Sequence, residues 1–285
     1  MINKISIGTA QFGFGYGLDH KNLPVSQPKI NQIFNFCSKN NIKSIDTAKS
    51  YGSSEKNIGE YFKNHNFKGW NVTTKFGHID EPLKDQLVSS IEKLKVKPST
   101  ILAHSINLYQ MESFQDQIKE LKQEDINLKT GVSVYTSDDI EKALQFQENL
   151  DVIQLPLSIL DTRLIRKGLL KKINSLNIEI HARSIFLKGL FYLSEIELES
   201  RFKGAVESLN FLKNVLKKEN LTLPEYSLLF VASRKEITKV VVGIENLTQL
   251  KEHCNTLKKH FDSRIFFEAL KLDFNDEFIL NPSLW

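Results

Sequence analysis

Four residues in the first half of the sequence have side chains that could act together on a carbonyl group: Asp46, Tyr51, Lys75 and His104. A tyrosine hydroxyl can be a general acid, but its ordinary pKa of about 10 is too high for easy proton transfer near neutral pH. A lysine cation close to Tyr51 would favour the phenolate, and an aspartate of opposite charge would stabilise that lysine. A histidine could donate a hydrogen bond to the substrate oxygen and stabilise the negative charge that develops there.

Each of these residues also has a structural interpretation when it is taken alone. Asp46 could cap the helix that follows it, and Tyr51 could pack within a loop. Lys75 could face solvent at the end of a strand, and His104 could be a hydrogen-bonded polar residue at the rim of the fold. Only a fold that brings all four together favours a catalytic role.

The elements that must position these residues follow a regular alternation. Short apolar segments, typical of buried parallel strands, alternate with longer segments of helical periodicity. The predicted strands are Ile5–Gly8, Ile42–Asp46, Asn71–Lys75, Thr100–Ala103, Lys129–Val134, Asp151–Leu155, Glu179–Ala182 and Lys239–Val242. Hairpin signals are missing between them, which indicates parallel strands joined by helical crossovers.

Helices are predicted between the strands, for example at Pro28–Asn40 and Leu83–Lys95. Ser137 is expected to cap a helix that runs to Phe146. The long segment from Leu187 to Thr222 is expected to contain one helix, Ala205–Lys218.

Eight strand-helix units favour an α/β fold of one domain over residues 1–285, a (β/α)8 TIM barrel with a closed parallel sheet of eight strands. An open doubly wound sheet is the alternative. In such a barrel the functional residues lie at the carboxyl ends of the strands. Asp46, Lys75 and His104 stand at three consecutive strand ends, and Tyr51 follows the first of them, so a barrel would gather them around one pocket.

The composition excludes several other classes of protein. The net charge of +4 comes from 38 basic and 34 acidic residues that are spread along the chain, so no nucleic-acid partner is expected. Cys37 and Cys254 cannot form a disulfide framework and should be buried thiols. Neither a signal peptide nor an apolar run of about 18 residues is recognisable, so we expect a cytoplasmic protein with no membrane partner. We also expect a monomer and no metal site.

The residues around Tyr51 resemble a motif of the aldo-keto reductase family. The segment Ser44–Glu55 reads SIDTAKSYGSSE and matches every fixed position of the family pattern DTAxxYGxSE. Thr73–Lys75 and Leu94–His104 are similar to the segments of that family that carry its lysine and histidine. The resemblance implies a catalytic tetrad in which Tyr51 protonates the carbonyl oxygen, Lys75 is held by Asp46, His104 orients the substrate, and a reduced nicotinamide supplies hydride.

The same resemblance implies several cofactor-binding residues. Ser133, in a segment similar to the family motif GVSN, and Gln154 would hold the carboxamide of the nicotinamide. Arg183 stands where a stacking aromatic residue is common, and its guanidinium plane can also stack on a ring. Gly243 lies in a segment that resembles the phosphate-binding loop, and Glu252 has the position of a residue that contacts adenine.

The family favours NADPH, which is therefore the expected cofactor, with NADH as the alternative. Gln249 stands where an arginine commonly holds the 2′-phosphate, and Gly243 replaces a frequent lysine. A 2′-phosphate without a cation partner would bind less tightly.

The expected partner is a small-molecule carbonyl substrate. The opening segment GTAQFGFGYG resembles a branch of the family in bacterial sugar metabolism, which favours a sugar-derived aldehyde or ketone. The loop Gly13–Gly17 and residues Phe12, Phe14, Asn107 and Phe186 should face this substrate. Two alternatives remain: a non-catalytic nicotinamide-binding auxiliary or regulatory protein of the same fold, and an aldolase in which Lys75 forms a Schiff base.

Overall fold

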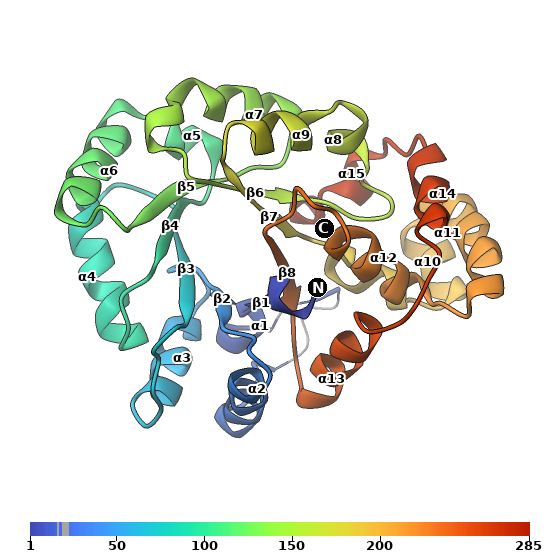
Figure 1. Cartoon of the computed structure of the whole chain (residues 1–285), viewed down its shortest axis with the longest axis horizontal. Helices are drawn as coiled ribbons and strands as arrows, with labels where there is room; N and C mark the ends of the chain where they lie inside the picture. Colours follow the sequence, from blue (N-terminus) through green and yellow to red (C-terminus); the bar gives the residue numbers. More distant parts are fainter. Residues whose placement is uncertain (16, 19–22) are drawn as a thin grey trace.

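Eight parallel strands and their crossover helices form a closed barrel in the computed structural model, which describes residues 1–15, 17–18 and 23–285 (Figure 1). The strands are β1 (Ile5–Gly8), β2 (Ser44–Asp46), β3 (Asn71–Phe76), β4 (Thr100–Ala103), β5 (Lys129–Ser133), β6 (Val152–Pro156), β7 (Glu179–Arg183) and β8 (Lys239–Gly243). They follow one another around the barrel, and pairing of β1 with β8, with Ile7 opposite Val242, closes it. The predicted (β/α)8 barrel is confirmed.

Most of the larger helices cover the outside of this barrel (Figure 1). They include α2 (Gln27–Lys39), α3 (Ser54–Phe62), α4 (Leu83–Leu94), α6 (Glu112–Glu124), α7 (Ser137–Ala143), α9 (Leu169–Ser175), α12 (Leu223–Ala232) and α13 (Leu247–Thr256). In α4, Leu83, Leu87 and Leu94 are buried at helical spacing, which explains why the apolar stripe of this segment predicts a helix. Further helices occupy the connections: α1 (Ala10–Gly13), α5 (Ile106–Tyr109), α8 (Arg163–Arg166), α10 (Glu195–Arg201), α11 (Lys203–Leu216), α14 (Phe266–Lys271) and α15 (Glu277–Leu280).

Two predictions about helices are wrong in detail. The cap of α7 is Thr136, whose hydroxyl accepts from Asp139 N, so Ser137 is the first residue inside the helix. This helix ends at Ala143, and a 3-10 segment with a non-helical Phe146 follows it.

The segment after β7 contains two α-helices, α10 and α11, where one was predicted. Ser194 and Glu197 form a capping box that starts α10. Phe202 then leaves helical geometry, with φ −138° and ψ 44°, and separates the two helices. The local signal for this break is weak: Gly204 follows Phe202 by two residues, and no proline is nearby.

The core consists of aliphatic and aromatic side chains from both the barrel and the helices. Every residue of β1 and of β6 is buried, as expected for parallel strands that are covered by helices. Cys37 and Cys254 are buried free thiols, as predicted. In the described part of the chain, no helix is long and apolar enough to cross a membrane.

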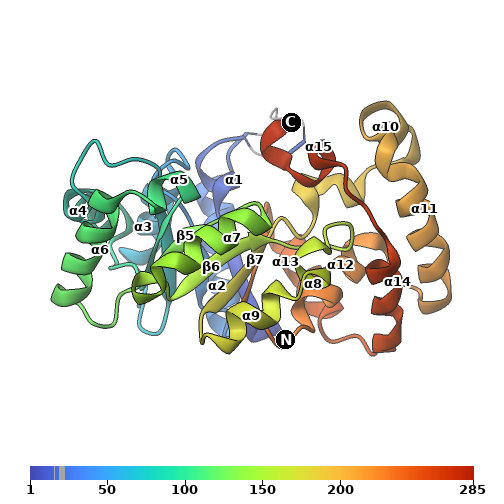
Figure 2. The ribbon, with the colours of Figure 1, turned by 90° about the horizontal axis from the view of Figure 1, so that it is seen from above.

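The two ends of the chain lie on opposite sides of the barrel. Figure 2 shows the N-terminus at the bottom and the C-terminus, with α15, at the top. Residues of the C-terminal turn Pro282–Leu284 line the main cavity, together with residues at the carboxyl ends of the strands. The last residues of the chain therefore cover the end of the barrel where function is expected.

Candidate active site

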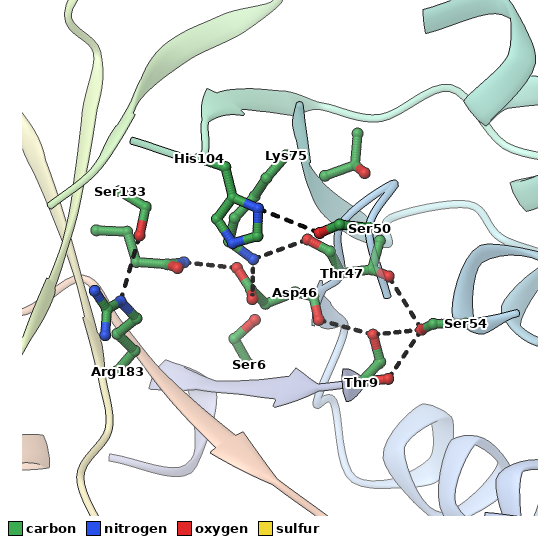
Figure 3. Close-up of polar contacts among 12 residues, drawn as sticks. Ser6, Thr9, Asp46, Thr47, Ser50, Ser54, Lys75, His104, Ser133 and Arg183 are labelled. Carbon is green, nitrogen blue, oxygen red and sulfur yellow. Dashed lines mark hydrogen bonds and ion pairs between the residues drawn. The ribbon is translucent and has the colours of Figure 1, made fainter. Parts of the chain in front are cut away.

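The four predicted catalytic residues meet at the carboxyl ends of β2, β3 and β4 (Figure 3 shows Asp46, Lys75 and His104). Lys75 is 1% exposed, and its Nζ donates to Asp46 Oδ1 at 2.6 Å and to the Thr47 carbonyl at 2.8 Å. The same Nζ lies 5.0 Å from the ring centroid of Tyr51. The rings of Tyr51 and His104 are in edge contact, with centroids 5.9 Å apart.

The ion pair between Lys75 and Asp46 keeps a positive charge buried beneath Tyr51. Burial alone lowers the pKa of Lys75, but the interactions with Asp46 and Tyr51 outweigh it and raise this pKa above its ordinary value. Lys75 is therefore a permanent cation near neutral pH. Because a buried charge must be paired, Asp46 is needed to keep it there.

Asp46 has a second partner that fixes its other oxygen. The side-chain Nε2 of Gln154, at the centre of β6, donates to Asp46 Oδ2 at 2.6 Å across the barrel. Lys75 on β3 and Gln154 on β6 thus each hold one oxygen of the Asp46 carboxylate. Gln154 also lines the cavity, so its amide carbonyl can still accept a hydrogen bond from a ligand.

His104 is a neutral hydrogen-bonding group in this site. Burial lowers the pKa of His104 to about 4, and the charge of Lys75 acts in the same direction. The Ser50 hydroxyl lies 3.3 Å from Nδ1. When this hydroxyl donates to Nδ1, the proton of the ring is on Nε2, where it can be donated to a substrate oxygen.

Three hydroxyl groups hold the loop after β1 against the loop after β2, and sequence reasoning missed this cluster (Figure 3). Thr9 Oγ1 donates to the Asp46 carbonyl at 2.9 Å, and Ser54 Oγ lies 2.9 Å from Thr9 Oγ1. Thr47 Oγ1 lies 3.1 Å from Ser54 Oγ. The serine and threonine of the motif around Tyr51 are therefore buried positioning residues, which a pattern match alone cannot reveal.

The backbone of Tyr51 packs directly against Gly13, at the end of α1. A Cβ on Gly13 would overlap the Tyr51 carbonyl oxygen. Gly52, which follows Tyr51, has φ +53°, and a Cβ there would lie 2.6 Å from the Gly13 carbonyl oxygen. The two glycines thus set how closely the loop that carries Tyr51 approaches the first loop.

Replacing Gly13 by alanine should therefore displace Tyr51. We expect kcat/KM to fall by about 10²-fold, as for a misplaced catalytic group, and the free energy of unfolding to fall by about 1–3 kcal/mol because of overpacking. Steady-state kinetics and urea unfolding measure the two effects. Gly77→Ala is the matched control, since a Cβ on Gly77 has no atom within 4 Å; equal kinetics of the two variants would contradict this role of Gly13.

A cavity of about 610 Å³ opens above these residues. Seven of the nine predicted site residues line it: Asp46, Tyr51, His104, Ser133, Gln154, Arg183 and Gly243. Lys75 lies behind Asp46, buried in the barrel. Glu252 is exposed on α13 and does not line the cavity; its helix neighbours Gln249 and His253 do.

Arg183 is held flat on one side of the cavity. Its guanidinium carbon lies 4.0 Å from the centroid of the Tyr135 ring. Its nitrogens donate to the hydroxyl of Ser133 at 3.3 Å, to the Val134 carbonyl at 2.8 Å and to Ser184 Oγ at 3.1 Å. The guanidinium is a fixed, planar surface of the kind on which an aromatic ligand can stack. Tyr135, its support, is a residue that the motifs did not indicate.

The residues predicted to face the substrate separate into two groups. Phe14 contacts Tyr51 edge-on, with ring centroids 6.0 Å apart, and Phe186 lines the cavity. Phe12 is fully buried in the core against Phe34, and Asn107 is exposed outside the cavity lining. Within the loop Gly13–Gly17, Tyr16 lies outside the described residues. Phe12 was predicted as a loop residue, but it belongs to the short helix α1, which turns its ring inward.

His104 and His253 should make the stability of the fold depend on pH. Burial lowers the pKa of His253, like that of His104, to about 4 in the folded chain. Between pH 6.5 and 4 the unfolded chain then binds more protons, so the stabilisation is complete above pH 6.5 and is lost as the pH falls. The free energy of unfolding of the wild-type protein should therefore fall as the pH is lowered. In His253→Asn we expect this fall to be smaller, by about 1 kcal/mol per pH unit.

Urea unfolding at pH 7, 6 and 5 measures how the free energy of unfolding changes with pH. Carboxylates stay roughly fully ionised over this range. His260→Asn is the control because His260 is exposed. An unchanged slope in His253→Asn would show that His253 is protonated to the same extent in both states.

A barrel with a buried ion pair and a cavity at the carboxyl ends of its strands is typical of (β/α)8 enzymes. The model of the Aldo/keto reductase family matches residues 4–268. The chain belongs to the aldo/keto reductase family. It is therefore an oxidoreductase of a family that acts on small carbonyl compounds and generally uses NAD(P)H.

Solved structures agree with this assignment at the level of the fold. The aldo-keto reductase AKR11C1 from Bacillus halodurans, in its holo form, is similar with a TM-score of 0.72 and 17% identity, over 94% of this chain and 91% of that chain. PA4992 from Pseudomonas aeruginosa, described as an aldo-keto reductase, is similar with a TM-score of 0.64 and 16% identity. This match covers 94% of this chain and 91% of that chain. A search of the curated proteins gave no match.

Proposed function

We propose that this protein reduces an aldehyde or ketone to an alcohol with NADPH or NADH, and that Tyr51 is the general acid. The observation that carries the proposal is the buried Lys75–Asp46 pair, whose Nζ lies 5.0 Å from the centroid of the Tyr51 ring at the edge of the cavity. A buried ion pair generally adds little net stability compared with apolar side chains of similar volume. The cation does favour loss of a proton from a nearby hydroxyl.

The lining of the cavity supports a nicotinamide dinucleotide as cofactor. Its volume of about 610 Å³ is suited to a cofactor-sized ligand. The Ser133 hydroxyl and the Gln154 amide carbonyl can pair with a carboxamide, and the fixed face of Arg183 can support a ring. Lys188, which also lines the cavity, supplies a cation for an anionic diphosphate.

In the proposed reaction a reduced nicotinamide supplies the hydride that the carbonyl carbon accepts. His104 and Tyr51 bind the carbonyl oxygen by hydrogen bonds and so polarise the double bond. Tyr51 gives its proton to that oxygen as negative charge develops on it. Lys75 stabilises the phenolate that remains. Asp46 holds Lys75 in place, and Gln154 in turn holds Asp46.

The experiment is a turnover assay in which the purified protein, NADPH or NADH, and a panel of aldehydes and ketones are mixed, and the loss of reduced cofactor is followed. The proposal expects saturable turnover of at least one carbonyl compound. Tight binding of cofactor without turnover of any compound would instead favour a non-catalytic auxiliary protein.

We propose a sugar-derived aldehyde or ketone as the substrate class. Support comes from the polar side chains of Gln11 and Ser184, which line the cavity and can pair with hydroxyl groups. Turnover of aromatic or steroid carbonyls alone would contradict this choice. The cytoplasmic location and the monomeric state stay predictions from the sequence.

A further inference from the structure

The cavity extends from the catalytic residues to helix α13, on the outside of the barrel. Tyr51 and His104 follow β2 and β4, whereas Glu245, Gln249 and His253 lie after β8 and on α13. In Figure 1, α13 stands in the outer ring beside α2. If the proposed function is correct, the nicotinamide must lie beside Tyr51. The adenosine half of the cofactor is then left for the end of the cavity at α13.

The first turn of α13 holds the backbone of Glu245 in a fixed position. Gln249 Oε1 accepts from the backbone N–H of Glu245 at 2.9 Å. Asn246 caps the helix, since its Oδ1 accepts from Gln249 N at 3.0 Å. Glu245 is half-buried and has no ion-pair partner in the described part of the chain. The backbone of Glu245 is therefore fixed, and its carboxylate, which has no ion-pair partner among the described residues, is available for a ligand.

Among the described residues, no lysine or arginine after β8 lines this end of the cavity. Lys251, on α13, is exposed and faces a separate, smaller hollow. The cations that line the described part of the cavity, Arg183 and Lys188, end or follow β7. Lys188 donates to the Pro282 carbonyl at 2.6 Å, and Arg183 is held by the contacts given above. A dianionic group beside α13 would therefore lie near the carboxylate of Glu245, and no lysine or arginine of the described residues after β8 lines the cavity there to neutralise its charge.

NADH and NADPH differ at this end of the cofactor. The adenosine ribose of NADH has two free hydroxyls, which can donate hydrogen bonds to a carboxylate. NADPH has a phosphate on the 2′ oxygen, which a carboxylate repels and which proteins usually bind with arginine or lysine. In dinucleotide-binding sites of another fold, an acidic residue contacts the 2′-hydroxyl of NAD, and an arginine accommodates the phosphate of NADP.

We propose that Glu245, supported by Gln249, makes this reductase selective for NADH over NADPH. The carboxylate of Glu245 accepts hydrogen bonds from the adenosine ribose and repels a 2′-phosphate. This inference rests on the proposed function and replaces the expectation of NADPH, which came from the resemblance to the family.

The test is a calorimetric titration of the wild-type protein with NADH and with NADPH at one fixed ionic strength. We expect NADH to bind about 10- to 100-fold more tightly, because it forms a charge-assisted hydrogen bond with Glu245 and avoids the repulsion that a 2′-phosphate meets. In Glu245→Gln the two affinities should approach each other. In Glu245→Gln combined with Gln249→Arg the preference should reverse. Glu207→Gln, on the exposed side of α11, is the control for the change in net charge and should keep the wild-type preference.

The outcomes separate this inference from the function on which it rests. Equal or tighter binding of NADPH to the wild-type protein would overturn the selectivity and leave a nicotinamide-dependent reductase. An unchanged preference in Glu245→Gln would overturn the role of Glu245. Binding of neither dinucleotide would overturn the proposed function and, with it, the inference.

Discussion

Replacing Tyr51 by phenylalanine is expected to lower kcat for carbonyl reduction by about 10²- to 10⁴-fold, the usual contribution of a general acid. The ring would keep its contacts with His104 and Phe14, because those contacts are made by its carbon atoms. The substitution removes the hydroxyl, which is the proposed proton donor and also interacts with Lys75. Steady-state assays with a carbonyl that the wild-type protein reduces measure the effect, and calorimetry should show that cofactor affinity is preserved.

Tyr61→Phe is a suitable control for this substitution. The Tyr61 hydroxyl donates to Asn35 between α2 and α3, outside the cavity, so its removal should leave kcat near the wild-type value. Retention of most of the turnover in Tyr51→Phe would show that another group protonates the substrate oxygen.

Lys75→Met should damage both stability and activity. The substitution leaves Asp46 buried without its cation, and removing one partner of a buried pair typically costs about 3–5 kcal/mol. The positive charge that favours the phenolate of Tyr51 is lost as well. We therefore expect a large fall in kcat, together with a lower free energy of unfolding in urea.

A double variant separates these two effects. Asp46→Asn combined with Lys75→Met removes both charges, so its stability should lie closer to that of the wild-type protein than the stability of Lys75→Met does. Its kcat should stay as low as in the single variant, because the cation is still missing. Recovery of turnover along with stability would mean that the ion pair has a structural role only.

The barrel could be predicted from the sequence because its strands carry strong local signals. Segments such as Asp151–Leu155 are largely apolar and lie between helical patterns, which is typical of buried parallel strands. The predicted ends agree with the structure within one or two residues, and strand order follows from the alternation. Tyr51 and the three residues around it, Asp46, Lys75 and His104, could be placed together for the same reason, since the barrel fixes where strand ends meet.

Other features depend on contacts that no local pattern encodes. The hydroxyl cluster of Thr9, Thr47 and Ser54 joins two loops that become neighbours only when β1 pairs with β2. The hydrogen bond between Gln154 and Asp46 crosses the barrel and joins two residues that are 108 positions apart in the sequence. The sequence suggested a ligand-binding role for Gln154, and the structure adds that it orients a carboxylate.

The end of the cavity at α13 was the least predictable part of the site. Gln249 and His253, one turn apart on α13, line the cavity, whereas Glu252 is exposed and does not line it. Glu245 lies in the turn before α13, and its backbone is placed by a hydrogen bond within that turn.

The most direct test of the proposed reaction follows the hydrogen itself. The wild-type protein is incubated with a carbonyl substrate and NADH or NADPH that carries deuterium at the transferable position of the nicotinamide, and the alcohol is analysed by mass spectrometry. The account predicts one deuterium on the former carbonyl carbon, and almost none in the same time with Tyr51→Phe. An alcohol without deuterium, or a labelled alcohol formed equally fast by Tyr51→Phe, would contradict it.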